Sequence, residues 1–154
     1  MNETIKIVEP SIEISELQKN TIPELSRVLP NSSVEFIGSM AVPISGKSEI
    51  DIMIVSDSVE NDSQALSKLG YNQGPSLKGI SYLSAKRNGI HIDIQILPTG
   101  NKMIEIHRRT LRKLKEDIVL SKAYEQFKRS LDGLPKDEYK KKKKEWMKKN
   151  LLND

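Results

Sequence analysis

The sequence has no cysteine, only two histidines, and few aromatic residues, which make up 5% of its 154 residues. Without cysteine the chain cannot form a disulfide framework, a thiolate nucleophile or a cysteine-ligated zinc site, a composition that fits a reducing cytosol. No uncharged apolar run approaches the roughly 18 residues that a membrane-spanning helix needs, and the first residues lack the features of a secretory signal peptide. We therefore expect a soluble, cytoplasmic protein with no membrane partner.

Positive charge is concentrated near the C-terminal end of the chain. The net formal charge is +4, whereas residues 136–149 alone contain eight lysines against three acidic residues, a local charge of +5. The rest of the chain is therefore close to neutral. This distribution makes the lysine-rich segment the candidate for contact with a phosphate-bearing partner.

The length predicts a single domain spanning residues 1–154, with a core at about 5–100 and a helical part at about 101–152. Alternating apolar residues predict strands at residues 5–8, 34–37, 50–54, 80–85 and 90–97. Apolar residues at helical spacing predict helices at 14–29, 57–71, 102–130 (as one helix or two) and 134–152. Pro23 leaves open whether the first helix is continuous or begins afresh at Thr21. Asn88-Gly89 predicts a tight hairpin turn.

Two of the predicted strands carry acidic residues on one face. In the first, Glu49 and Asp51 alternate with isoleucines, and in the second Asp93 does the same. Successive side chains of a strand point to opposite faces, so the isoleucines face one way and the carboxylates the other. The polar faces of both strands could therefore meet on one side of a sheet, with His91 beside Asp93.

A glycine-serine pair, Gly38-Ser39, ends the predicted strand 34–37, and Asp51 follows after an eleven-residue gap at positions 40–50. Phosphoryl chemistry gives each part a role. Glycine lets the backbone approach a triphosphate, a serine hydroxyl binds it, and a strand-borne carboxylate positions magnesium. This spacing resembles the minimal motif of the DNA polymerase beta-like nucleotidyltransferase superfamily, in which Gly-Ser precedes an Asp-hydrophobic-Asp pair by about ten residues.

A closer resemblance is to the GrpB family, whose members carry a segment like EHIGSTAVPGLAAKPIIDI. Residues 35–43 (EFIGSMAVP) and 47–52 (KSEIDI) match this segment. Less specific matches lie in the helical part, at Arg108, Tyr124, Tyr139, Lys143 and Trp146. The resemblance implies an α+β fold, a nucleotidyltransferase-like mixed β-sheet flanked by helices, with further helices at the C-terminal end.

The chain departs from the superfamily pattern at Met53, which stands where active nucleotidyltransferases carry the second carboxylate of the pair. Asp51 then lacks its usual partner. A set of Glu49, Asp51 and Asp93 could instead hold one metal ion, or two in an altered geometry. Glu49 taken on its own fits plain strand surface better than a role as a ligand.

The resemblance implies a role for each candidate residue. Gly38 and Ser39 would bind the phosphates of a nucleoside triphosphate, Asp51 and Asp93 would hold Mg²⁺, and Asp93 would activate an acceptor hydroxyl. Lys47 or Lys143 would offset charge on the departing pyrophosphate. The function expected is Mg-dependent nucleotidyl transfer to an unknown acceptor, such as RNA or another phosphate-bearing molecule.

The alternative is a non-catalytic nucleotide- or RNA-binding module with a degenerate metal site, so the sequence leaves open whether the protein is an enzyme. In that case the run at residues 140–144 would contact phosphate, although a helix spreads five consecutive lysines around more than one turn. Tyr139, Lys143 and Trp146 share one helix face, which predicts that this face packs on the domain. The neighbouring lysines, Lys140, Lys141, Lys144 and Lys148, would then stay exposed.

Overall fold

A five-stranded mixed sheet forms the centre of the computed structural model, which describes residues 4–8, 12–37, 46–47 and 49–151. Its strands, in spatial order, are β2 (Ser33–Ile37), β4 (Glu49–Ser56), β7 (Ile90–Pro98), β6 (Ile80–Arg87) and β5 (Asn72–Leu77). The β4–β7 pair is parallel and the other pairs are antiparallel. A small second sheet pairs β1 (Ile7–Val8) with β3 (Gly46–Lys47). The expected α+β fold with a mixed sheet is confirmed.

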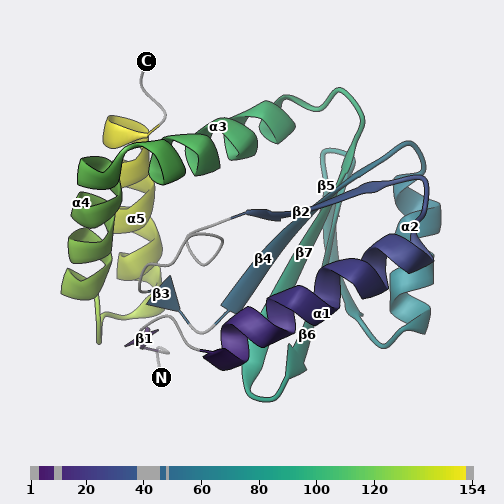
Figure 1. Cartoon of the computed structure of the whole chain (residues 1–154), viewed down its shortest axis with the longest axis horizontal. Coiled ribbons are helices and arrows are strands. Elements are labelled where there is room, and N and C mark those ends of the chain that lie inside the picture. The colour runs from purple at the N-terminus through teal and green to yellow at the C-terminus, as the bar shows by residue number, and fades with distance from the viewer. Residues whose placement is uncertain (1–3, 9–11, 38–45, 48, 152–154) are drawn as a thin grey trace.

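Two helices, α1 (Ile12–Val28) and α2 (Val59–Lys68), cover one face of the sheet (Figure 1). The isoleucines of β4 and β7 point into this layer. The buried side chains of this layer include Leu25 of α1, Leu66 of α2, and Ile50, Ile52, Ile54, Ile92 and Ile94 of the two strands. The predicted alternation of the two isoleucine-rich strands is therefore correct on this face. The helix α1 runs without interruption through Pro23.

The other face of the sheet is partly covered by α3 (Lys102–Glu116), whose Ile104 packs against Met53 and Leu97. Met53 has no exposed surface. Strand β4 is therefore buried on both faces over its second half, and the expectation of a strand buried on one face only is wrong there. On β4, the open polar surface is confined to the first residues, where Glu49 and Asp51 lie.

Two C-terminal helices, α4 (Ile118–Ser130) and α5 (Lys136–Asn150), pack side by side near β3 (Figure 1). Trp146 stacks on Tyr124 and Phe127, with ring centroids 4.9 and 5.3 Å apart. Tyr139 is buried and Lys143 and Trp146 are half-buried, so the predicted packing face of α5 is confirmed. The lysines expected on the open side, Lys140, Lys141, Lys144 and Lys148, are all exposed.

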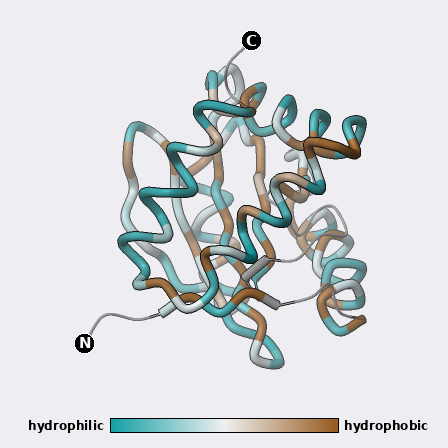
Figure 2. The backbone as a smooth tube through the Cα atoms, turned by 90° about the vertical axis from the view of Figure 1, so that its left-hand side faces the viewer, coloured by the Kyte–Doolittle hydropathy of each residue, from teal (hydrophilic) through white to brown (hydrophobic). Residues whose placement is uncertain are grey.

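The β6–β7 hairpin follows its sequence signal, whereas β5 was not predicted. Asn88 and Gly89 both adopt positive φ angles, 54° and 77°, as the tight turn requires. Every residue of β5 is exposed, and its pairing with β6 alone makes it a strand. Figure 2 shows hydrophilic residues interspersed with hydrophobic ones along the outer helices. In the described ranges, no helix has both the length and the apolarity needed to cross a membrane.

An ion pair links α3 to the outer strand β2. Arg108 donates from its Nε to Glu35 Oε1 at 3.0 Å and from a terminal nitrogen to Oε2 at 2.6 Å. These hydrogen bonds hold the pKa of Glu35 below its ordinary value, against the opposing effect of burial. The pair therefore stabilises the fold only while Glu35 is ionised.

Replacing Arg108 with alanine should lower the free energy of unfolding by about 1 kcal/mol at pH 7, because the pair is bidentate but partly exposed. A lowered folded-state pKa gives stability that is present above the unfolded value and is lost as pH falls through the folded value. Urea unfolding should therefore show a smaller difference from the wild type at pH 3 than at pH 7. Arg112→Ala is the control, because its 3.6 Å pair with Glu105 is more exposed. An equal loss at both pH values would contradict the ion-pair account.

Candidate functional site

Three carboxylates meet on the open part of the sheet. Asp51 on β4 is in register with Asp93 on the parallel strand β7, and Glu49 lies two residues before Asp51 on the same face. One carboxylate oxygen from each of the three residues lies within 4.8 Å of the other two oxygens, and all three residues are half-buried. The structure thus brings together the three acidic residues singled out in the sequence, and their role as metal ligands stays a prediction.

His91 belongs to the same surface. Its Nε2 lies 3.0 Å from Asp93 Oδ1, and it is in register with Glu49 across the β4–β7 pair. About half of each side chain of this His91–Asp93 pair is exposed. The expectation that His91 lies beside Asp93 is therefore confirmed.

Two buried tyrosines, Tyr124 on α4 and Tyr139 on α5, lie close enough to Glu49 and Asp51 to sense their charges. Burial raises the pKa of Tyr124 well above its ordinary value, and both carboxylates raise it further. Burial also raises the pKa of Tyr139 to about 12, with smaller effects from the carboxylates and an opposing one from Lys143. Both phenols are therefore neutral at physiological pH. The sequence offered Tyr124 as a family match and Tyr139 also as a packing residue of its helix, with no sign that either approaches the carboxylates.

Two lysines accompany these rings. Lys143 lies with its Nζ 5.9 Å from the ring centroid of Tyr139. Lys128, which was not among the candidate site residues, is 1% exposed and lies with its Nζ 5.1 Å from the ring centroid of Tyr124. Buried lysine is rare in proteins unless its charge is compensated, and here the ring of Tyr124 is one of its neighbours.

The remaining candidates fall in different places. Gly38 and Ser39 lie outside the described residues, and so does the side chain of Lys47, whose backbone pairs with Ile7. Met53 lies in the core beneath α3, away from the open surface. The second carboxylate beside Asp51 is therefore Glu49, which precedes it. Position 53 therefore supplies no carboxylate to Asp51, as expected, and the acidic neighbours of Asp51 are Glu49 and Asp93.

A cavity of about 560 Å³ opens beside the carboxylates and includes Glu49, His91 and Asp93 in its lining. Lysines from three different segments complete its polar wall. The site therefore combines a compact group of carboxylates with a cationic surround.

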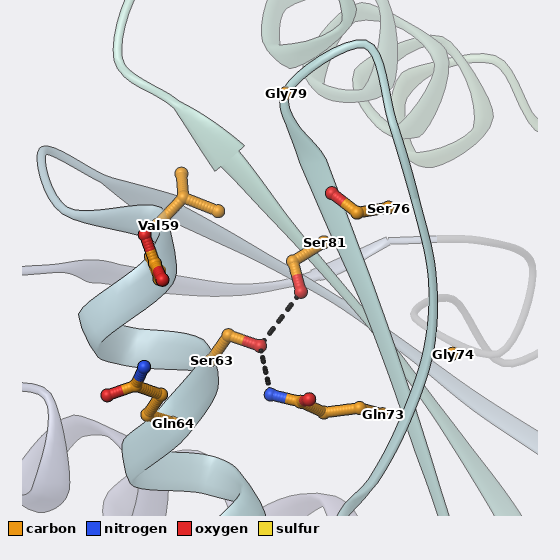
Figure 3. Close-up of a pocket in the computed structure, with 9 residues that line it drawn as sticks. Val59, Ser63, Gln64, Gln73, Gly74, Ser76, Gly79 and Ser81 are labelled. Carbon is orange, nitrogen blue, oxygen red and sulfur yellow. Dashed lines mark hydrogen bonds between the residues drawn. The ribbon is translucent and has the colours of Figure 1, made fainter.

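A second cavity, of about 480 Å³, lies between α2 and the β5–β6 hairpin (Figure 3). Ser63 points toward Ser81 and Gln73, as Figure 3 shows. Its hydroxyl lies 2.9 Å from Ser81 Oγ and accepts a hydrogen bond of 2.9 Å from Gln73 Nε2. These side chains form hydrogen bonds with one another, which indicates a polar contact that holds α2 on the hairpin.

Comparisons with known proteins agree with this architecture. The family model described as GrpB protein matches residues 4–152. A crystal structure of the conserved protein GrpB from Enterococcus faecalis superposes with a TM-score of 0.72 at 23% identity, covering 93% of this chain and 98% of that one. A curated UPF0157 protein of Vibrio cholerae is 28% identical over 125 residues, 78% of this chain and 66% of that protein, just under two thirds of its length.

More distant structures share the fold. A cytoplasmic RNA terminal U-transferase has a TM-score of 0.51 at 17% identity, with 78% of this chain and 42% of that chain covered. The Cid1 poly(U) polymerase also has a TM-score of 0.51, at 16% identity, with 77% and 42% covered. This chain thus spans less than half the length of either enzyme, and the likeness concerns the fold alone.

Proposed function

The chain belongs to the GrpB family, and from that premise we propose that it is a metal-dependent nucleotidyltransferase acting on a nucleoside triphosphate and a hydroxyl acceptor. The observation that carries the proposal is the group of Glu49, Asp51 and Asp93, whose oxygens lie within 4.8 Å on adjacent parallel strands. A U-transferase and a poly(U) polymerase share the fold, which supports the same class of reaction here.

The donor set suits a hard divalent cation. Three carboxylates offer only oxygen ligands, the kind that Mg²⁺ and Mn²⁺ prefer. Glu49, Asp51 and Asp93 would hold the ion. A bound divalent cation would supply charge neutralisation for the phosphate oxygens of the triphosphate.

The protein's own residues would perform the remaining tasks. Gly38 and Ser39 would bind the triphosphate. They come directly after Ile37 in the sequence, and Ile37 is the residue of β2 that pairs with Asp51. Asp93 would take the proton of the acceptor hydroxyl, and Lys143 or Lys47 would offset charge on pyrophosphate. The neutral phenols of Tyr124 and Tyr139 add no negative charge behind the carboxylates.

Calorimetric titration of ATP, GTP, CTP and UTP, each with and without magnesium, tests the proposal before any acceptor is known. We expect at least one triphosphate to bind more tightly when magnesium is present, because a bound cation offsets the repulsion between the carboxylates and the phosphates. The matching nucleoside, which has no phosphate, is the control ligand. Equal binding without magnesium, or no binding at millimolar concentration, would contradict the proposal and favour the non-catalytic alternative.

A further inference from the structure

The cavity beside the carboxylates is lined by four lysines that come from three separate parts of the chain. Lys6 lies in the N-terminal segment, Lys86 near the end of β6, and Lys136 and Lys140 on the first turns of α5. All four side chains are exposed. A cluster assembled in this way depends on the fold, since no short stretch of sequence contains it.

Backbone contacts fix the N-terminal segment against the start of α5. The Ile5 amide donates to the Leu134 carbonyl at 3.0 Å, and the Gly133 amide donates to the Ile5 carbonyl at 2.8 Å. The Ile7 amide donates to Asp132 Oδ1 at 2.9 Å. Lys6 is thereby held beside the turn that leads into α5.

The other three lysines are placed by regular structure. Lys136 and Lys140 are four residues apart on α5 and so lie on the same side of that helix. Lys86 is in register with His91 near the end of the β6–β7 hairpin. The helix N-terminus and the hairpin therefore bring their ammonium groups to one cavity.

The charges in this cavity do not cancel internally. Four ammonium groups line the cavity with two carboxylates, Glu49 and Asp93, which the proposed function assigns to a cation together with the adjacent Asp51. Within the described residues, Lys6, Lys86 and Lys140 form no salt bridge. The positive end of the α5 dipole adds to the same potential, so an anion bound here would be strongly favoured.

We infer that the cavity binds the phosphate group of the acceptor, a small hydroxyl compound bearing a phosphate monoester. This inference rests on the proposed function. The volume of the cavity, about 560 Å³, lies within the range of small-molecule sites. The cavity adjoins Asp93, whereas Ile37, the residue before the predicted triphosphate-binding pair in the sequence, lies on the opposite side of Asp51. The acceptor therefore enters from the β7–β6 side and the triphosphate from the β2 side.

The arrangement gives the transfer step a defined course. With its phosphate on the lysines, the acceptor presents its hydroxyl beside Asp93. The hydroxyl oxygen forms a bond to the α-phosphorus of the triphosphate, and its proton passes to the Asp93 carboxylate. The bond from the α-phosphorus to the oxygen bridging to the β-phosphate breaks, and pyrophosphate leaves with that electron pair.

Nuclear magnetic resonance titrations of the full chain with AMP and with adenosine, in EDTA without added metal, test the inference. We expect AMP to shift the amide signals of residues around the cavity, and adenosine to have no such effect. Lys86→Ala and Lys140→Ala should each weaken AMP binding about five- to tenfold, the loss of one charge-assisted contact. Lys141→Ala is the matched control, since this exposed neighbour on α5 carries the same charge outside the cavity lining.

Three results would overturn the inference. Adenosine could bind as well as AMP, or Lys141→Ala could weaken binding as much as Lys140→Ala, which would indicate diffuse attraction to α5. Alternatively, AMP could compete with a magnesium-bound, non-hydrolysable ATP analogue, which would assign the cavity to the triphosphate. Because the AMP titrations contain no metal, their failure is distinguishable from a failure of metal binding at the carboxylates.

Discussion

Replacing Asp51 with asparagine should weaken Mn²⁺ binding by about a hundredfold or more. Asp51 is the central member of the group, because it lies beside Glu49 on its own strand and beside Asp93 on the next. Asparagine keeps the size and one oxygen but removes the negative charge. Calorimetry or electron paramagnetic resonance of Mn²⁺ in the wild type and the variant measures the change.

The same variant should be at least as stable as the wild type. Three carboxylates within 4.8 Å repel one another in the absence of a cation, and Asp51→Asn relieves part of this repulsion. Glu116→Gln, an exposed change near the end of α3, is the control and should leave Mn²⁺ binding unchanged. Glu49→Gln should weaken binding about tenfold. Unchanged Mn²⁺ affinity in Asp51→Asn would refute the metal site. Unchanged Mn²⁺ affinity in Glu49→Gln would show that Glu49 is not a ligand and is plain strand surface.

The strands and helices with strong hydrophobic periodicity were predictable from the sequence. Those that are defined by pairing with a neighbouring element were not. The isoleucine alternation located β4 and β7, because their side chains are buried by α1 and α2. Strand β5 is wholly exposed and carries no apolar pattern, so only its pairing with β6 defines it. The division between α3 and α4 falls at Asp117, whose side chain accepts a hydrogen bond from the Leu120 amide. That N-cap signal is present in the sequence and could have fixed the boundary.

The candidate site was predictable only in part, for a similar reason. Alternation along two strands placed Asp51 and Asp93 on matching faces, but their approach depends on β4 and β7 being parallel neighbours in register. The positions of Tyr124, Tyr139 and Lys128 depend on how α4 and α5 dock, which no local pattern specifies. Burial of these three side chains is a property of the tertiary structure.

Burial gives a structural reason for methionine at position 53. The superfamily pattern suggested that its side chain replaces the second carboxylate, after Asp51. In the structure Met53 has no exposed surface and packs with Leu97 and Ile104 beneath α3. A carboxylate-hydrophobic-carboxylate order does occur two residues earlier, at Glu49, Ile50 and Asp51, which follow the Gly-Ser pair after positions 40–48.

Met53→Asp should therefore lower the free energy of unfolding by about 3–5 kcal/mol and should not improve metal binding. The introduced carboxylate would lie in an apolar cluster, where burial disfavours its charged form and raises its pKa. Part of the lost stability should accordingly return when the pH is lowered toward 5, because the neutral acid is cheaper to bury. Urea unfolding at pH 7 and pH 5 measures both effects.

Met53→Leu separates the loss of fit from the burial of charge. Leucine conserves volume and polarity, so this variant should lose less than about 1.5 kcal/mol and bind Mn²⁺ as the wild type does. A stable Met53→Asp protein with tighter Mn²⁺ binding would place position 53 in the metal site and remove Glu49 from it. A destabilised Met53→Asp beside a wild-type-like Met53→Leu would mean that methionine is kept at position 53 by the packing of α3, so its presence says nothing against catalysis.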